Sequence, residues 1–285
     1  MEKLTSISKI NELKSKYNFF LNKRYGQNFL TDENIIHKIL EGAHISKDDY
    51  ILEIGPGIGA MTQHLCENAK HVIAVEIDKK LKPILEETLN EYDNITIIND
   101  DILKINIHNE LKKVTSQKFK VIANLPYYIT TDIIMTLLEN NLPLESITVM
   151  VQKEVAQRMV AIPGGKDYGS LSVAVQYYSK PEIVAIVPKT VFIPQPKVES
   201  SVIKLNILEN PPVEVNKDAF FKVVRASFAM RRKTILNCIS ARLNMEKNMV
   251  KEILENNNID PLRRGETLSL EEFAQVARNI ESAKG

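Results

Sequence analysis

The chain has 285 residues, of which 44% are hydrophobic and 26% charged, and its formal net charge is +1. This composition is ordinary for a soluble globular protein, and the length allows one large domain and a small one. The N-terminal stretch has no apolar signal core and no later run approaches the length of a membrane span, so we expect a cytoplasmic protein.

The first pattern along the chain is a loop followed by a helix. Residues 26–30 read as a loop, and Thr31 or Asp32 is positioned to begin a helix. Apolar residues then recur at helical spacing on one face: Ile35, Ile36, Ile39 and Leu40. We therefore predict an amphipathic helix here.

A glycine-rich turn follows a short apolar strand at residues 50–54. Gly55 and Gly57 let the backbone approach a ligand closely, and the helix after them offers free N–H groups. The next predicted strand, 71–75, ends at Glu76, roughly 20 residues past the first glycine, where an acid can hold ribose hydroxyls. The same pattern fits a dinucleotide site, so it indicates either a nicotinamide or flavin enzyme or an S-adenosylmethionine enzyme.

The third predicted strand, 95–98, places a second carboxylate, Asp101, at the neighbouring strand end. An acid there can accept a hydrogen bond from an adenine amine. Glu76 or Asp101 alone is more typical of a solvated strand end or a helix cap than of a ligand site. On consecutive strands of one parallel sheet, they predict a site for an adenosyl group.

The fourth predicted strand, 119–123, runs into the sequence Asn124-Leu125-Pro126-Tyr127. By itself this segment is typical of a turn that ends a strand. Beside an adenosyl site, the same segment predicts a place where the exocyclic amine of a planar base binds. An Asn side-chain oxygen and the carbonyl of Leu125 or Pro126 could accept both hydrogens of an exocyclic amine, while the Tyr127 ring covers the heterocycle.

Strands and helices alternate from about residue 50 to 151, which predicts an α/β fold with a doubly wound parallel sheet. The helices expected between or after these strands are 79–89, 131–139 and 153–160. Residues 171–178 fit either a helix or a strand. Residues 183–187 and 202–207 predict two closing strands at an antiparallel edge.

Asn210-Pro211-Pro212 is the clearest linker, and only helical patterns follow it. We therefore predict a domain at 1–212 and a small all-helical domain at 213–285. Its expected core stripe is Phe220, Phe221, Val224, Phe228 and Ile235. The two cysteines, Cys66 and Cys238, fall on apolar helix faces and are predicted to be reduced core thiols without a metal-ligand pattern.

The helical domain also contains a local basic run, with a single acid, Asp218, between residues 217 and 243. Such a run is typical of a solvated helix face, but beside a base-modifying pocket it favours binding to a phosphate backbone. The basic residues are Lys217, Lys222, Arg225, Arg231, Arg232, Lys233 and Arg242.

Together these segments resemble the ribosomal RNA adenine dimethylase family, and within it the bacterial enzymes of the small subunit. The resemblance rests on the order and combination of eight segments: Lys23–Leu30, Glu53–Gly59, Val75–Asp78, Asp101–Leu103, Asn124–Tyr127, Gln152–Ala156, Tyr168–Val173 and Phe192–Ser201. It implies a Rossmann-like methyltransferase domain and a helical domain that binds ribosomal RNA. The implied reaction is dimethylation, by S-adenosylmethionine, of the N6 amines of two adjacent adenosines near the 3′ end of small-subunit ribosomal RNA. The implied partner is a maturing small subunit, and we expect a monomer without a metal.

The resemblance also implies site residues. Tyr127 and Phe192 would stack on the target base, although a large ring such as Phe192 in a proline-rich loop is equally expected to pack into the core. The reacting amine would meet Asn124, Leu125 and Pro126. The cofactor site would comprise Asn28, Leu30, Gly55, Gly57, Glu76, Asp101 and Asn124. The RNA-binding candidates are Lys222, Arg225, Arg231, Arg232 and Lys233.

Three other functions compete with this one. A methyltransferase of a large-subunit RNA adenine, which confers macrolide resistance, would share the amine-binding motif. A dinucleotide oxidoreductase fits only the glycine loop and Glu76. A noncatalytic factor in small-subunit assembly would keep the basic domain without needing an intact amine pocket.

Overall fold

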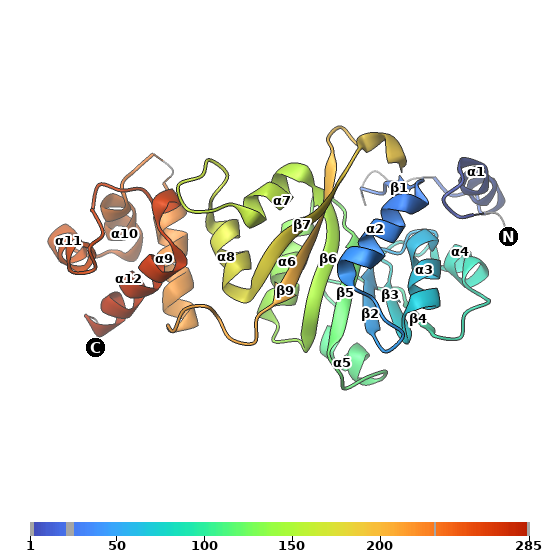
Figure 1. Ribbon diagram of the computed structural model, residues 1–285, viewed down its shortest axis with the longest axis horizontal. Helices are drawn as coiled ribbons and strands as arrows, with labels where there is room; N and C mark the ends of the chain where they lie inside the picture. Colours follow the sequence, from blue (N-terminus) through green and yellow to red (C-terminus); the bar gives the residue numbers. More distant parts are fainter. Residues whose placement is uncertain (1–2, 21–25, 231, 284–285) are drawn as a thin grey trace. The chain divides into compact units, whose positions relative to one another are not determined.

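The computed structural model describes residues 3–20, 26–230 and 232–283 (Figure 1). Lys23, Arg24 and Tyr25 of the first family segment, and Arg231 of the basic run, lie outside the described residues. Within the described ranges, no helix is both long and apolar enough to cross a membrane.

The centre of the fold is a seven-stranded sheet. In spatial order its strands are β4 (Ile95–Ile98), β3 (His71–Val75), β2 (Tyr50–Ile54), β5 (Phe119–Asn124), β6 (Leu144–Gln152), β9 (Ser200–Ile207) and β7 (Ser179–Val187). The first five are parallel, and β9 runs antiparallel to β6. This confirms the predicted Rossmann-like sheet with an antiparallel edge, and puts the carboxyl ends of β2, β3 and β5 at one edge.

Helices flank these strands, which is why strands such as β2 and β5 are almost wholly buried. The helices are α1 (Ile7–Lys16), α2 (Glu33–Ala43), α3 (Ala60–Asn68), α4 (Lys82–Thr88), α5 (Ile107–Lys112), α6 (Thr130–Glu139) and α7 (Lys153–Val160). A short 3₁₀ turn, η2, spans Lys189–Val191. The predicted helix at 79–89 starts later, at Lys82, because Asp78 accepts the N–H of Lys80 at 3.1 Å in a turn and Pro83 occupies the first helical turn.

Helix α2 begins where the sequence predicted. The Asp32 side chain caps it by accepting the N–H of Asn34 at 2.9 Å. Its buried apolar face, which includes Ile36 and Ile39, packs against β6 and β9 (Figure 1). The helix thereby covers one face of the sheet next to the glycine-rich turn.

Residues 26–30 were predicted to form a plain loop, and this prediction is wrong for the last two of them. Phe29–Leu30 forms strand β1, which pairs antiparallel with β8 (Phe192–Ile193) in a separate two-stranded sheet. The two strands are far apart in the chain, so no local pattern could show the pairing. It places Asn28 and Leu30 beside the carboxyl edge of the main sheet.

By their internal contacts, the residues form two compact units. The sheet unit contains the described residues up to 156 together with 182–207, and the helical unit contains 157–181 together with those from 208 onward. The helices of the second unit are α8 (Ser170–Tyr178), α9 (Lys217–Phe228), α10 (Ile235–Leu243), α11 (Lys247–Asn256) and α12 (Leu270–Ser282), with a 3₁₀ turn, η3, at Gly265–Thr267. Residues 171–178, which fitted two structures, are therefore helical.

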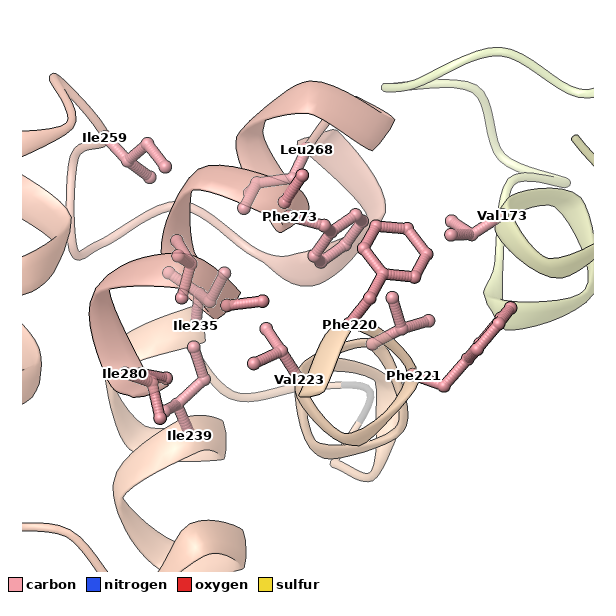
Figure 2. Close-up of a cluster of buried hydrophobic side chains, with 14 of the residues drawn as sticks. Val173, Phe220, Phe221, Val223, Ile235, Ile239, Ile259, Leu268, Phe273 and Ile280 are labelled. Atoms are coloured by element: carbon pink, nitrogen blue, oxygen red, sulfur yellow. The ribbon is translucent and has the colours of Figure 1, made fainter. Parts of the chain in front are cut away.

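The helical unit has its own apolar core (Figure 2). Phe220 and Phe221 of α9 meet Ile235 of α10 and Phe273 of α12 there, and Val173 of α8 joins them. The predicted stripe is confirmed, with four of its side chains buried and Phe228 partly buried against the same cluster. Both cysteines are buried and free, as predicted.

Candidate functional site

The turn after β2 adopts a backbone that favours glycine. Gly55, Gly57 and Gly59 have φ angles of +70°, +64° and +92°. A side chain at Gly57 would also come within 3.1 Å of the Phe29 ring. The turn then leads directly into α3, whose first N–H groups have no partner within the helix.

Glu76 lies immediately after β3 and faces the glycine turn. Its carboxylate accepts the N–H of Gly57 at 3.2 Å and the N–H of Asp78 at 2.8 Å. The side chain is buried, and burial raises the pKa of Glu76 to about 7, although these N–H groups oppose the rise. The residue therefore holds a desolvated acceptor at the strand end, as the sequence predicted.

A second carboxylate, Glu53 of β2, lies in the same place. It is completely buried, and neither of its oxygens has a hydrogen-bond partner among the described residues. Burial raises the pKa of Glu53 to about 8. The sequence analysis gave Glu53 no role. A lone acid within an otherwise apolar strand could have indicated a functional group, because a buried acid usually needs a partner.

The Asn124 side chain is oriented by a hydrogen bond. Its Nδ2 donates to the Asn28 carbonyl oxygen at 3.0 Å, which leaves Oδ1 as a free acceptor. The Pro126 carbonyl already accepts the Thr130 hydroxyl at 2.9 Å and the Ile129 N–H at 3.3 Å. The Leu125 carbonyl has no donor among the described residues. Of the two carbonyls predicted to accept an amine hydrogen, only that of Leu125 is thus available.

The two predicted stacking rings differ in exposure. Tyr127 is half-buried, and its hydroxyl makes a 2.6 Å hydrogen bond with the Ser200 hydroxyl, which fixes the ring beside the Asn124 segment. Phe192 is buried in the apolar cluster that also contains Leu30 and Ile36. In this conformation Phe192 packs into the core, and its stacking role stays a prediction.

One cavity in the sheet unit gathers most of the predicted cofactor and amine residues. Its lining includes Asn28, Leu30, Gly55, Gly57, Glu76, Asn124, Leu125 and Pro126, and also the unpredicted Glu53. The polar groups fit the cofactor that the sequence implied: two carboxyl groups and an amide oxygen converge on an otherwise apolar cavity, and glycines at 55 and 57 let a ligand approach the backbone closely.

Asp101 is not among the residues that line this cavity. Its carboxylate accepts the N–H of Leu103 at 3.1 Å and pairs with the Lys104 ammonium at 3.3 Å. These contacts are those of a capped turn after β4. An adenine contact for Asp101 stays a prediction.

The basic candidates belong to the helical unit. Lys222 and Arg225 are exposed on α9, and Arg232 and Lys233 are exposed in the turn between α9 and α10 rather than on a helix face. None of these four has an ion pair with a described residue. Across the described ranges, no group of acidic, His or Cys side chains is arranged to hold a metal ion.

The family description for ribosomal RNA adenine dimethylases matches residues 18–276. The chain is 53% identical to the ribosomal RNA small subunit methyltransferase A of Alkaliphilus oremlandii, over 98% of this chain and 99% of that protein. It is 52% identical to the protein of the same name from Clostridioides difficile, over 100% and 99% of the two chains.

Solved structures agree with these sequence matches. The fold is similar to a dimethyladenosine transferase from Plasmodium falciparum, with a TM-score of 0.74 and 26% identity, over 90% of this chain and 98% of that one. It is also similar to the 23S rRNA methyltransferase ErmE, with a TM-score of 0.68 and 25% identity over 89% and 99%. Because the family match and the relatives both extend over nearly all of the sequence, the chain belongs to the ribosomal RNA adenine dimethylase family.

Proposed function

We propose that this protein dimethylates the N6 amines of two adjacent adenosines near the 3′ end of small-subunit ribosomal RNA, in a maturing small subunit and as a monomer. The relatives that share about half of its residues along their full length are named as small-subunit enzymes, which favours this substrate over large-subunit RNA. The observation that carries the chemistry is the oriented Asn124 amide next to the free Leu125 carbonyl.

The two buried carboxylates support S-adenosylmethionine as the cofactor. Glu53 and Glu76 line the cavity, and a cation bound there would offset the free energy that burial costs their ionised forms. S-adenosylmethionine is a cation at its sulfonium and carries an electrophilic methyl group. A nicotinamide dinucleotide would bring an anionic diphosphate instead, which offers a buried acid such as Glu53 no such compensation. The cavity therefore favours the methyl donor over the dinucleotide that the glycine turn alone would accept.

Asn124 and Leu125 would act on the amine of the target adenine. The lone pair of that amine is delocalised into the ring, so the amine is a poor nucleophile. Asn124 Oδ1 and the Leu125 carbonyl would accept its two hydrogens, which favours a pyramidal nitrogen with its lone pair directed at the methyl group. The methylated amine is acidic enough to lose its proton to water, so no strong general base is needed.

The half-buried Tyr127 supports the base-binding side of the site. Its hydroxyl bond to Ser200 holds the ring in place, so that one face can cover the adenine. With only hydrogen bonds to the amine and ring stacking to satisfy, a monomethyl product could bind again. This would allow two methyl groups on one nitrogen.

The experiment is methyl incorporation from labelled S-adenosylmethionine into undermethylated small subunits, into large-subunit RNA, and into a reaction without RNA. We expect incorporation only with small subunits, at two methyl groups per target adenosine. Incorporation into large-subunit RNA would favour the resistance enzyme. Binding to small subunits without incorporation would favour a noncatalytic assembly factor.

A further inference from the structure

Residues 26–30 contact two of the strand ends that form the site. Gln27 Nε2 donates to Asp78 Oδ2, in the turn after β3, at 3.0 Å. The carbonyl of the next residue, Asn28, accepts Nδ2 of Asn124 at the end of β5, also at 3.0 Å. These hydrogen bonds join residues that lie 51 and 96 positions apart in the chain. Two adjacent residues thus connect the cofactor end of the cavity with the end that holds the amide.

Asp78 is a fixed anchor for Gln27. Its side chain is buried, and its two carboxylate oxygens have separate partners. Oδ1 accepts the N–H of Lys80 at 3.1 Å, which leaves Oδ2 directed at Gln27. The backbone N–H of Asp78 donates to the Glu76 carboxylate at 2.8 Å. The anchor therefore belongs to the same turn as the acid that is predicted to hold the ribose of the cofactor.

Asn28 is held from both sides. On one side Phe29 and Leu30 pair with β8, and on the other side the Gln27 side chain is bonded to Asp78. Without the Gln27 bond, the backbone of Asn28 would be held mainly through β1, so its carbonyl could move away from the end of β5. The bond between Gln27 and Asp78 limits that movement.

The position of the Asn28 carbonyl decides how the Asn124 amide lies. The two ends of an amide have nearly the same shape, and the last torsion of an asparagine has two broad minima. A carbonyl oxygen accepts only from the NH₂ end, so Asn28 turns Nδ2 toward itself and Oδ1 away. Among the described residues, the Asn124 side chain has no second hydrogen bond. Loss of this bond would let the amide rotate and present a donor where the amine needs an acceptor.

We infer that Gln27 and Asp78 are positioning residues for methyl transfer. Their hydrogen bond keeps the Asn28 carbonyl against Asn124, and Asn124 Oδ1 then faces the reacting amine. Neither Gln27 nor Asp78 would touch that amine or the methyl group. The inference rests on the proposed function, because that function gives Asn124 its role at the amine. Weakening the bond should slow the transfer step itself, beyond any effect on cofactor affinity.

The test exchanges donor and acceptor between the two side chains. Gln27→Glu places a carboxylate against that of Asp78, which breaks the hydrogen bond and adds repulsion. Single-turnover transfer to small subunits, with enzyme and S-adenosylmethionine saturating at about pH 8 to keep both carboxyls ionised, should slow about tenfold, the factor of one hydrogen bond of ordinary net strength. Adding Asp78→Asn should restore nearly the parent rate. The new amide then donates to the new carboxylate, and its oxygen keeps the Lys80 N–H.

Matched controls separate this effect from charge and folding. Gln117→Glu makes the same charge change at an exposed glutamine and should keep the parent rate. Asp78→Asn alone completes the double-mutant cycle, in which the two changes together should cost less than Gln27→Glu alone. Calorimetry without RNA measures the cofactor affinity of each variant, and thermal melts check that each is folded. A rate loss that disappears at saturating cofactor would contradict the inference.

A second cycle shows whether Gln27 acts through Asn124. Gln27→Ala should slow single-turnover transfer about tenfold in the parent, again the factor of one hydrogen bond. In the Asn124→Ala background it should slow transfer no further, because the group that it positions is then absent. A general loosening of the structure would instead lower both rates by the same factor, and that result would overturn the inference.

A readout that needs no activity keeps the inference separate from the proposed function. The side-chain NH₂ signal of Asn124 in a proton–nitrogen correlation spectrum is identified by its loss in Asn124→Ala. Gln27→Glu should shift this signal, because the Asn28 carbonyl no longer holds the amide in place. Adding Asp78→Asn should return the signal to the parent position.

The outcomes are distinguishable from failure of the proposed function. If the parent methylates small subunits, and Gln27→Glu keeps both the parent rate and the parent Asn124 signal, the inference is wrong and the methyltransferase function stands. If the parent methylates no RNA, the proposed function fails. An Asn124 signal that still shifts in Gln27→Glu and returns with Asp78→Asn would then support the orienting bond by itself.

Discussion

The cavity of the sheet unit and the surface of the helical unit use charge in opposite ways. In the sheet unit, the carboxylates of Glu53 and Glu76 are buried among apolar groups. In the helical unit, cations such as Lys222 and Arg225 stay exposed around an apolar core. A buried charge acts strongly on one nearby group, whereas exposed charges act weakly, additively and in a salt-dependent way. Binding in the sheet unit should therefore depend on single residues, and binding by the helical unit on the sum of many.

The largest expected effect is that of Asn124→Ala on methyl transfer. Removing the amide that accepts an amine hydrogen should slow single-turnover transfer by about 100-fold or more, because the acceptor acts on the reacting nitrogen. The measurement uses small subunits saturated with enzyme and S-adenosylmethionine. Asn140→Ala, at an exposed asparagine after α6, is the control and should keep the parent rate. A rate for Asn124→Ala near that of the control would contradict the amine-acceptor role.

Next in size is the loss of cofactor affinity in Glu76→Ala. The carboxylate is held by the Gly57 and Asp78 N–H groups at the strand end, where ribose hydroxyls would donate to it. Removing these charge-assisted bonds should cost about 1.5–3 kcal/mol of binding free energy. Calorimetry with S-adenosylmethionine and with a nicotinamide dinucleotide tests both the residue and the choice of cofactor. Unchanged affinity for the methyl donor, or tight binding of the dinucleotide by the parent, would count against the site.

Glu53 should make the stability of the free protein depend on pH. Its pKa of about 8 in the folded protein lies above the ordinary 4.5, so the folded state retains a proton that the unfolded chain has released. The free energy of unfolding should therefore fall as pH rises from about 4.5 to about 8. Glu53→Gln removes this loss and should be more stable than the parent by several kcal/mol above pH 8, at about 1.4 kcal/mol for each pH unit between the two pKa values, and similar to it below pH 4.5.

Denaturant unfolding of parent and variant across this pH range measures the Glu53 effect. Glu76 is present in both proteins, so the difference between them isolates Glu53. Glu41→Gln changes an exposed acid on α2 and should leave the pH dependence unaltered. If the free energies of unfolding of parent and Glu53→Gln change in parallel with pH, the pKa of Glu53 in the folded protein is not raised.

The smallest effect per residue is expected in the helical unit. Changing Lys222 and Arg225 to glutamine should weaken binding to small subunits and reduce the slope of log affinity against log salt by roughly 0.7–0.9 for each RNA phosphate that the variant no longer neutralises. Cofactor binding should not change. Lys251→Gln, whose parent side chain pairs with Glu255 at 3.6 Å, is the control. Titrations in which the double variant keeps the parent slope would indicate a merely solvated helix face.

Much of the fold could be predicted from the sequence because the patterns that indicate it are local. The strands at 50–54, 71–75, 95–98 and 119–123 are apolar runs of strand length, and each was found within about one residue. The turn at Gly55 and Gly57 was readable because only glycine adopts its backbone easily. The core stripe of α9 followed from helical periodicity alone.

Other features depended on contacts between distant parts of the chain. Strand β1 exists because Phe29 and Leu30 pair with β8, and the orientation of Asn124 depends on the Asn28 carbonyl. Whether residues 171–178 formed a helix or a strand depended on the apolar core that receives Val173. Local propensity cannot decide such cases, since the competing structures differ mainly in what they pack against.

The sequence by itself determined the residue types of the site and their positions at the ends of consecutive strands, because strand ends and glycine turns are local events. Only the tertiary structure decided which of them share a cavity: it included Glu53 and Glu76 and left Asp101 in a turn beside Lys104. It also decided that Leu125 rather than Pro126 offers a free carbonyl, since Thr130 and Ile129 occupy the latter. The physical reason is that burial and hydrogen-bond competition belong to the surroundings of a group, and those surroundings are assembled from the whole chain.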